Sequence, residues 1–196
     1  SIWDQAKMTL DWVFRQWVFT PQEVKFLEQS MEYSENELAY ATIQQSKPQS
    51  LGYAFNDSPT GLAAWIIEKV RSWSDCKGDI DSVFSKDEIL THVMIYWVTN
   101  SITSSLRLYY ETKKAGRWTV PEQKVEIPVG CAIFPCEVVK VPRKWAENVY
   151  NVQRWTVMPS GGHFPAQEEP QLLVEDLRAF FQVYHKGCIE EESNTG

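Results

Sequence analysis

The first half of the chain carries apolar residues at helical spacing between clear helix-start signals. Thr20-Pro21-Gln22-Glu23 has the sequence of a capping box with proline at the first helical position, and it predicts a helix through about residue 38. Ser58-Pro59 predicts the start of another helix over "TGLAAWIIEKVRSW". The apolar residues that share one face of this second helix are Leu62, Trp65, Ile66 and Val70. We therefore expect a mostly helical first half.

A further start signal lies at Ser85-Lys86-Asp87-Glu88, which has the sequence of a second capping box. It opens one long apolar run, "ILTHVMIYWVTNSITSSLRLYYE". The residues of this run that we expect to be buried on one face are Leu90, Met94, Trp97 and Val98.

The pattern changes at about residue 124, where short apolar strands begin to alternate with helices. "KVEIPVGCAIF" predicts a strand, and Pro128 within it favours an edge position or a strand start. Val141-Pro142 predicts a helix through about Tyr150, followed by the strand "QRWTVM" and the amphipathic helix "QLLVEDLRAFFQV". Strand, helix, strand, helix is the unit of a parallel α/β sheet. Because two strands alone do not make a stable sheet, we expect further strands upstream.

Composition narrows the class of partner. The chain has 196 residues, of which 43% are hydrophobic, with nine Trp, eight Tyr and nine Phe. Such an aromatic content suits a deep core or an apolar cavity. The formal net charge is −7, and phosphate binding needs a basic surface. We therefore expect neither nucleic acid nor an anionic membrane surface as a partner.

The cysteines and the absence of targeting signals indicate a compartment. The four cysteines, at positions 76, 131, 136 and 188, show no CxxC spacing, so we expect a reduced intracellular setting and no zinc site. The sequence shows no signal peptide and no apolar run of about eighteen residues, which favours a cytoplasmic location. Because the chain begins with Ser1 inside an apparent helix, we expect a processed or partial chain.

Two residues that could carry chemistry follow the predicted strands. Glu137 follows "CAIFPC" and His163 follows "RWTVMPSGG". Functional groups gather beyond the carboxyl ends of parallel strands, so Glu137 could hold the His163 imidazole and stabilise its charged form. The alternative is structural: a surface histidine on a glycine turn, and an ordinary cap or surface carboxylate. The residues alone leave both interpretations open.

The order of the pair adds an expectation. An acid followed by a histidine matches the last two members of an α/β-hydrolase triad, in which the nucleophile precedes both. A nucleophile on a glycine-flanked elbow should then lie upstream of Glu137. The sequence contains no Gly-x-[Ser/Asp/Cys]-x-Gly pattern.

Several long blocks resemble one enzyme family. They are "TIQQSKPQSLGYAFNDSPTGLAAWIIEKVRSW", "FSKDEILTHVMIYWVTNSITSSLRLYYE", "IPVGCAIFPCE" and "GGHFPAQEEPQLLVEDLRAFF". From about residue 35 to 183 the chain resembles the epoxide hydrolases of the microsomal type, α/β-hydrolase enzymes that convert epoxides to vicinal diols. The resemblance implies an α/β fold that is the C-terminal part of an α/β-hydrolase. A helical lid is followed by the last parallel strands and helices of the core.

The resemblance also implies roles for four residues. His163 and Glu137 match the pair that activates a water, and Tyr40 and Tyr109 match the two lid tyrosines that hydrogen-bond the epoxide oxygen. Tyr110 would point about 100° away from Tyr109 on the same helix. The family's chemistry implies a small apolar epoxide and water as partners, with no cofactor and no metal. The chain departs from the family at Pro165, where relatives have a small residue.

The family's domain plan divides the chain into three parts. Residues 1–123 match the lid with its flanking helices, residues 124–184 match the C-terminal core strands and helices, and residues 185–196 would be a disordered acidic tail. The family's Asp nucleophile and any membrane anchor lie before the lid. We therefore expect an epoxide hydrolase part that is inactive until a complementary N-terminal segment joins it. The alternative is a non-catalytic remnant or binding module of the same superfamily.

Overall fold

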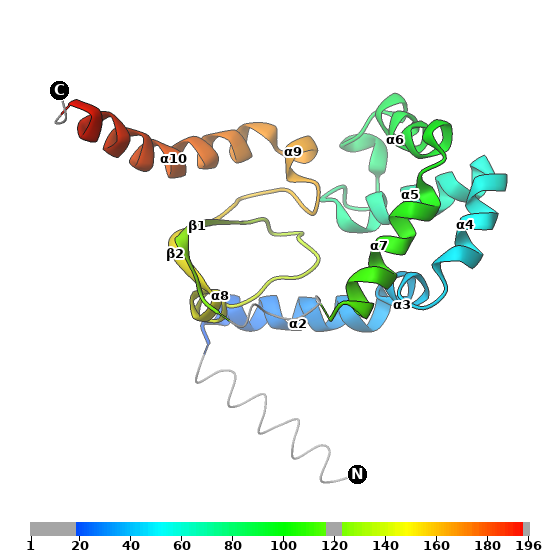
Figure 1. Ribbon diagram of the computed structural model, residues 1–196, viewed down its shortest axis with the longest axis horizontal. Coiled ribbons are helices and arrows are strands. Elements are labelled where there is room, and N and C mark those ends of the chain that lie inside the picture. Colours follow the sequence, from blue (N-terminus) through cyan, green and yellow to red (C-terminus); the bar gives the residue numbers. More distant parts are fainter. Residues whose placement is uncertain (1–18, 117–122, 194–196) are drawn as a thin grey trace, which may run out of the picture.

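The computed structural model describes residues 19–116 and 123–193, with side chains through residue 184. A helical part leads into a strand pair flanked by helices, and α2 runs along the base of both (Figure 1). The helical part comprises α2 (Pro21–Asn36), α3 (Ala39–Gln44), α4 (Pro48–Asp57), α5 (Pro59–Trp73), a 3-10 turn (Ile80–Ser82), α6 (Lys86–Thr99) and α7 (Ile102–Lys114). The second part comprises β1 (Val125–Ile133), α8 (Arg143–Val149), β2 (Tyr150–Val157), α9 (Pro165–Glu168) and α10 (Pro170–Ser193).

The helix starts follow the capping signals of the sequence. The Thr20 hydroxyl accepts from the backbone N–H of Glu23, whose carboxylate accepts from the backbone N–H of Thr20 at 2.8 Å. Ser85 and Glu88 repeat this arrangement at the start of α6. The Ser58 hydroxyl accepts from the N–H of Gly61 at 3.0 Å and caps α5. These contacts satisfy backbone donors that a helix start leaves unpaired.

The core of the helical part lies where α4, α5, α6 and α7 meet. Its buried residues are Phe55, Leu62, Val93, Ile102 and Leu106. Gly52 on α4 faces α7 so closely that a Cβ atom there would overlap the Thr103 side chain. α4 and α7 therefore pack closely against each other at this point.

The long apolar run after Ser85 forms two helices, α6 and α7. Asn100 adopts a left-handed conformation, with φ 54°, and ends α6 before α7 begins. Our prediction of the buried face was wrong for Leu90, Met94 and Val98, which are 51%, 47% and 68% exposed, whereas Trp97 is partly buried against the core. The buried positions are instead Ile89 and Val93. Apolar side chains surround most of α6, so their spacing does not determine which face packs.

The strands pair in parallel, as the sequence predicts, with α8 as the crossover. Val129 pairs with Val152 and Cys131 with Trp155, and the register shifts near Pro128. The pairing continues beyond the strand ends, since the N–H of Met158 donates to the carbonyl of Ile133 at 2.8 Å. The two chain segments that leave the carboxyl ends of β1 and β2 therefore lie side by side.

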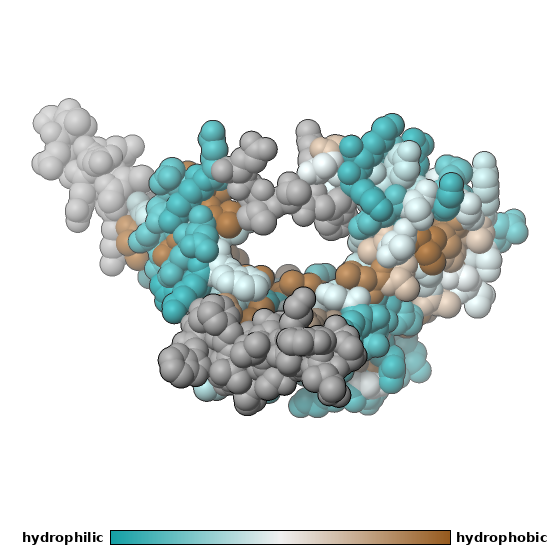
Figure 2. All heavy atoms as spheres, turned by 90° about the horizontal axis from the view of Figure 1, so that it is seen from below, coloured by the Kyte–Doolittle hydropathy of each residue, from teal (hydrophilic) through white to brown (hydrophobic). Residues whose placement is uncertain are grey.

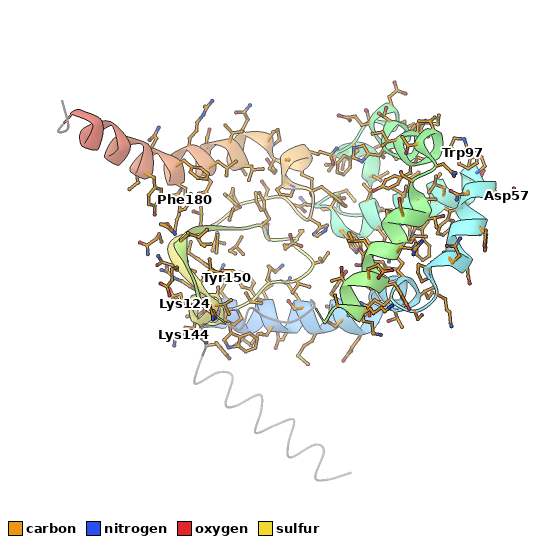
Figure 3. All side chains as sticks on the ribbon, viewed as in Figure 1. Asp57, Trp97, Lys124, Lys144, Tyr150 and Phe180 are labelled. Carbon is orange, nitrogen blue, oxygen red and sulfur yellow. The ribbon has the colours of Figure 1, made fainter. Side chains whose placement is uncertain are left out.

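α10 covers one face of this strand pair. Phe180 points from α10 towards the strands (Figure 3) and lies so near Gly130 that a Cβ atom there would be 3.0 Å from its ring. Asp176 accepts from Arg154 at 2.7 Å and from Thr156 at 2.7 Å, which fastens α10 to β2. α10 continues to Ser193, past residue 185, where we placed the start of a disordered tail.

Apolar side chains remain exposed on the second part. They include Ile127, Val157, Leu177, Phe181 and Val183. In the space-filling view the molecule is open between its two parts, with apolar residues beside the opening (Figure 2). Among the described helices, none combines the length and the apolar character needed to cross a bilayer.

Candidate active site

The loops after β1 and β2 bring Glu137 and His163 into direct contact. Nδ1 of His163 lies 2.7 Å from Oε1 of Glu137. The same oxygen accepts from the backbone N–H of Val138 at 2.7 Å, which orients the carboxylate. The two loops are joined to each other where the N–H of Cys136 donates to the carbonyl of Gly161 at 3.0 Å. The structure therefore places the two side chains together, and a catalytic role for the pair stays a prediction.

The two glycines before His163 are each required for a different physical reason. Gly161 has a positive φ of 102°, which side chains rarely adopt, and a Cβ atom there would lie 2.8 Å from the Phe134 ring. A Cβ atom at Gly162 would lie 2.6 Å from the backbone carbonyl of Trp73, at the end of α5. The glycine pair thus permits the histidine loop to approach the helical part.

The contact shifts the protonation of both partners. The hydrogen bond with Glu137 raises the pKa of His163, against the opposing effect of burial. Burial alone would raise the pKa of Glu137, but its hydrogen bond and charge interaction with His163 and its backbone hydrogen bonds outweigh that effect and lower it. With Nδ1 directed at the carboxylate, Nε2 is the nitrogen that can take a proton from water.

Replacing Glu137 with Gln should lower the pKa of His163 and alter the pH dependence of stability. His163 contributes stability that is complete below its ordinary pKa of 6.5 and is lost as pH rises through its raised folded value. Glu137 contributes stability that is complete above 4.5 and is lost as pH falls through its lowered folded value. Both contributions are complete between these two ordinary values, so the variant should lose most stability there. Imidazole NMR titration and thermal unfolding over this range measure the two effects.

Glu169→Gln is the matched control, since it removes a nearby carboxylate other than the one that is hydrogen-bonded to His163. An unchanged His163 titration in Glu137→Gln would contradict the assignment of the 2.7 Å contact as the source of the raised pKa.

Tyr40 and Tyr109 meet on the inner side of the helical part. Tyr40 lies on α3 and Tyr109 on α7, and their ring centroids are 5.9 Å apart in an edge-to-face arrangement. Burial, the largest cause, raises the pKa of each to about 12. Both phenols are therefore protonated at neutral pH and can donate a hydrogen bond. Tyr110 lies elsewhere, with the Lys114 ammonium 5.9 Å from its ring centroid.

Trp73 connects the tyrosines with the histidine. Its ring centroid is 5.2 Å from those of both Tyr40 and His163, and 6.4 Å from that of Phe164. Its backbone carbonyl accepts from the N–H of His163 at 2.9 Å. Sequence reasoning missed this residue, because an aromatic at a helix end carries no signal that distinguishes a site residue from a core residue.

A cavity of about 350 Å³ lies beside these rings. Its apolar wall includes Ile66, Val70, Ile102, Leu106 and Leu108, and its aromatic wall includes Tyr40, Trp73, Tyr109 and Phe164. Lys69 is the charged residue that lines it; the ammonium lies 5.3 Å from the Tyr40 ring centroid and 2.7 Å from a Glu37 oxygen. The size and the lining suit a small apolar molecule with one polar group directed at the phenols.

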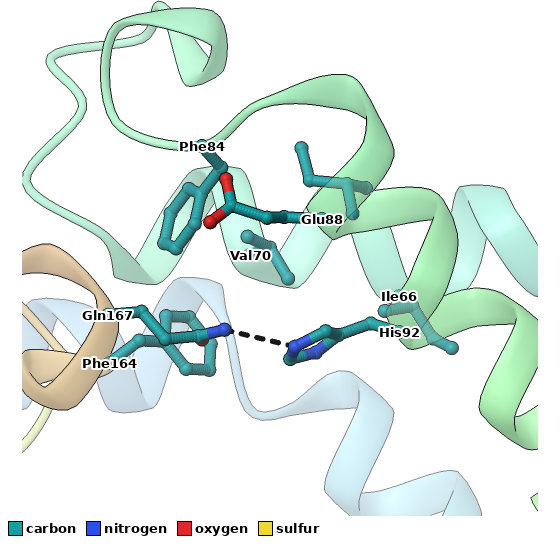
Figure 4. Close-up of a pocket in the computed structure, with 8 residues that line it drawn as sticks. Ile66, Val70, Phe84, Glu88, His92, Phe164 and Gln167 are labelled. Carbon is teal, nitrogen blue, oxygen red and sulfur yellow. Dashed lines mark hydrogen bonds between the residues drawn. The ribbon is translucent and has the colours of Figure 1, made fainter.

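A smaller pocket lies next to the cavity, between α6 and α9. Phe164 and His92 line both spaces. The amide nitrogen of Gln167 lies 3.0 Å from Nε2 of His92, so a polar contact links the helical part to α9 (Figure 4). Among the described residues, no group of His, Cys, Asp and Glu is placed to hold a metal ion.

Known proteins with similar sequences are epoxide hydrolases. No family profile matches the chain. It is 38% identical over 164 residues to a putative epoxide hydrolase of Stigmatella aurantiaca, covering 83% of this chain and 37% of the relative. It is 44% identical over 165 residues to epoxide hydrolase 1 of Sus scrofa, covering 80% and 35%. The chain thus spans little more than a third of the length of these relatives.

Solved structures agree with the sequences. The juvenile hormone epoxide hydrolase of the silkworm Bombyx mori matches with a TM-score of 0.81 and 28% identity, over 92% of this chain and 46% of that one. The Aspergillus niger epoxide hydrolase matches with a TM-score of 0.73 and 30% identity, over 84% and 40%. By sequence and by fold, the chain belongs to the epoxide hydrolases of the α/β-hydrolase fold and matches the C-terminal part of their length.

Proposed function

We propose that this chain supplies the lid donors and the water-activating base of an epoxide hydrolase. The observation that carries the proposal is the Nδ1–Oε1 contact of 2.7 Å between His163 and Glu137, joined through Trp73 to the paired rings of Tyr40 and Tyr109. The apolar cavity beside them supports a small apolar epoxide as the substrate.

In the first step a carboxylate attacks an epoxide carbon. The C–O bond of the strained ring at that carbon breaks, an ester bond forms between the carbon and the carboxylate, and the ring oxygen becomes an alkoxide on the neighbouring carbon, where it needs a proton donor. Tyr40 and Tyr109 donate to this oxygen, and one of them gives up its proton. Preorganised donors of this kind contribute on the order of 2.7–4 kcal/mol each to stabilising the transition state.

In the second step water hydrolyses the ester. Nε2 of His163 takes a proton as the water oxygen attacks the ester carbonyl carbon, and Glu137 stabilises the resulting imidazolium through Nδ1. The diol leaves, the carboxylate is regenerated, and the proton taken up by the imidazolium restores the phenol that was deprotonated in the first step. The pair therefore acts only after an ester has formed.

The attacking carboxylate belongs, in this proposal, to a complementary N-terminal segment that corresponds to the part of the relatives that this chain does not match. The exposed apolar residues of β1, β2 and α10 support such a partner, since further strands would pair with the open sheet edges and the elements packed with them would cover these side chains.

A chimera tests the proposal. The chain would replace the matching C-terminal region of the Sus scrofa epoxide hydrolase 1, and both the chimera and the 196-residue chain would be assayed with styrene oxide. We expect the chimera to form phenylethanediol and the chain alone to form none above the uncatalysed rate. A folded chimera without turnover, as judged by circular dichroism, would count against the proposal and favour a non-catalytic remnant.

A further inference from the structure

The loop that carries His163 is fastened to the end of α5 by one glutamate. Oε1 of Glu168 accepts from the backbone N–H of Phe164 at 2.8 Å. Oε2 of the same carboxylate accepts from the backbone N–H of Asp75 at 2.6 Å. Glu168 therefore bridges Phe164, directly after His163, and Asp75, two residues beyond the end of α5.

Asp75 completes the connection from the opposite side. Oδ2 of Asp75 accepts from the backbone N–H of Gly161 at 3.1 Å. The N–H of His163 also donates to the Trp73 carbonyl. Hydrogen bonds therefore hold the backbone at Gly161, at His163 and at Phe164. The backbone that carries the imidazole is thus held at each end of residues 161–164.

We propose that Glu168 is a positioning residue for His163, through the two backbone hydrogen bonds that its carboxylate accepts. Its function is to hold the imidazole at the end of α5, beside Trp73 and the tyrosine pair. This inference rests on the proposed function, since it assigns how the water-activating base is held between the two parts of the fold.

The chemistry of the bridge requires a carboxylate. Each of its oxygens accepts from a different backbone N–H, and glutamine offers only one acceptor oxygen, while its amide nitrogen can only donate. A buried N–H left without an acceptor costs about 1–3 kcal/mol, so the loop would move rather than stay in place. The negative charge of Glu168 also lies near enough to His163 to help raise the pKa of the imidazole.

The test is the Glu168→Gln variant of the 196-residue chain, studied without any substrate. We expect faster hydrogen exchange at the amides of Asp75 and Phe164. We also expect a fall in the pKa of His163, because a neighbouring charge is removed and the Glu137 contact is loosened. The chain has 3 histidines, so the His163 resonances can be assigned by substitution.

Glu169→Gln is the matched control, because it removes a neighbouring carboxylate that takes no part in the bridge; it should change neither readout. Unchanged amide protection and an unchanged His163 titration in Glu168→Gln would overturn the proposal. A lowered melting temperature with an unchanged His163 titration would also overturn it, since that result indicates a purely structural residue.

A measurement on the unmodified chain keeps the proposal testable if Glu168→Gln fails to fold. The amide protons of Asp75 and Phe164 should both be protected from hydrogen exchange, since both donate to this carboxylate. Rapid exchange at either amide would show that the two do not share Glu168. Because neither experiment uses turnover, its failure is distinct from the failure of the chimera.

Discussion

Replacing His163 with Gln in the chimera should reduce styrene oxide turnover by about 10²–10⁴-fold, the contribution expected of a general base. Glutamine can occupy the space of the imidazole but cannot take a proton from water. Because the base acts only in the second step, the ester should still form and then persist. Steady-state diol formation measures the first effect, and the intact mass of the protein after exposure to styrene oxide measures the second.

The control for this variant is Glu169→Gln, which should leave diol formation unchanged. Full turnover by the His163→Gln chimera would contradict the role of His163. Loss of turnover without any covalent adduct would place His163 in the first step instead, which also contradicts the account.

Replacing Tyr40 or Tyr109 with Phe should slow the first step by about 10²–10³-fold, the effect of removing one preorganised donor at a developing oxyanion. Each change removes a phenol oxygen and keeps the ring, so the edge-to-face contact, with centroids 5.9 Å apart, can remain. The measurement is the single-turnover rate of ester formation with an excess of protein over styrene oxide.

Tyr110→Phe is the matched control, since Tyr110 is adjacent in sequence to Tyr109 but does not line the cavity. It should retain the original rate. Equal losses in Tyr109→Phe and Tyr110→Phe would indicate a general effect on α7 rather than the loss of a donor.

The order of the secondary structure could be predicted from the sequence because local signals determine it. The capping boxes at Thr20 and Ser85 begin helices in the structure, and the two strands pair in parallel. The break at Asn100 and the buried face of α6 could not be predicted in the same way. Which side of a nearly all-apolar helix packs depends on neighbours that are distant in sequence.

The sequence predicted which four residues would form the candidate site, and their catalytic roles stay predictions. Strand order places Glu137 and His163 together, and the structure brings them into contact at 2.7 Å. The family blocks indicate Tyr40 and Tyr109, whose rings meet at a centroid distance of 5.9 Å. Trp73 and Glu168 were missed, because their roles depend on the fold that brings the end of α5 to the histidine loop.

The most direct test of the division of roles is the mass of the protein after exposure to styrene oxide, compared between two chimeras. The account predicts that His163→Gln accumulates an adduct of one styrene oxide per chain. It predicts no adduct on the same timescale for the chimera that carries both Tyr40→Phe and Tyr109→Phe. An adduct in the tyrosine variant, or its absence in the histidine variant, would contradict the assignment of donors and base.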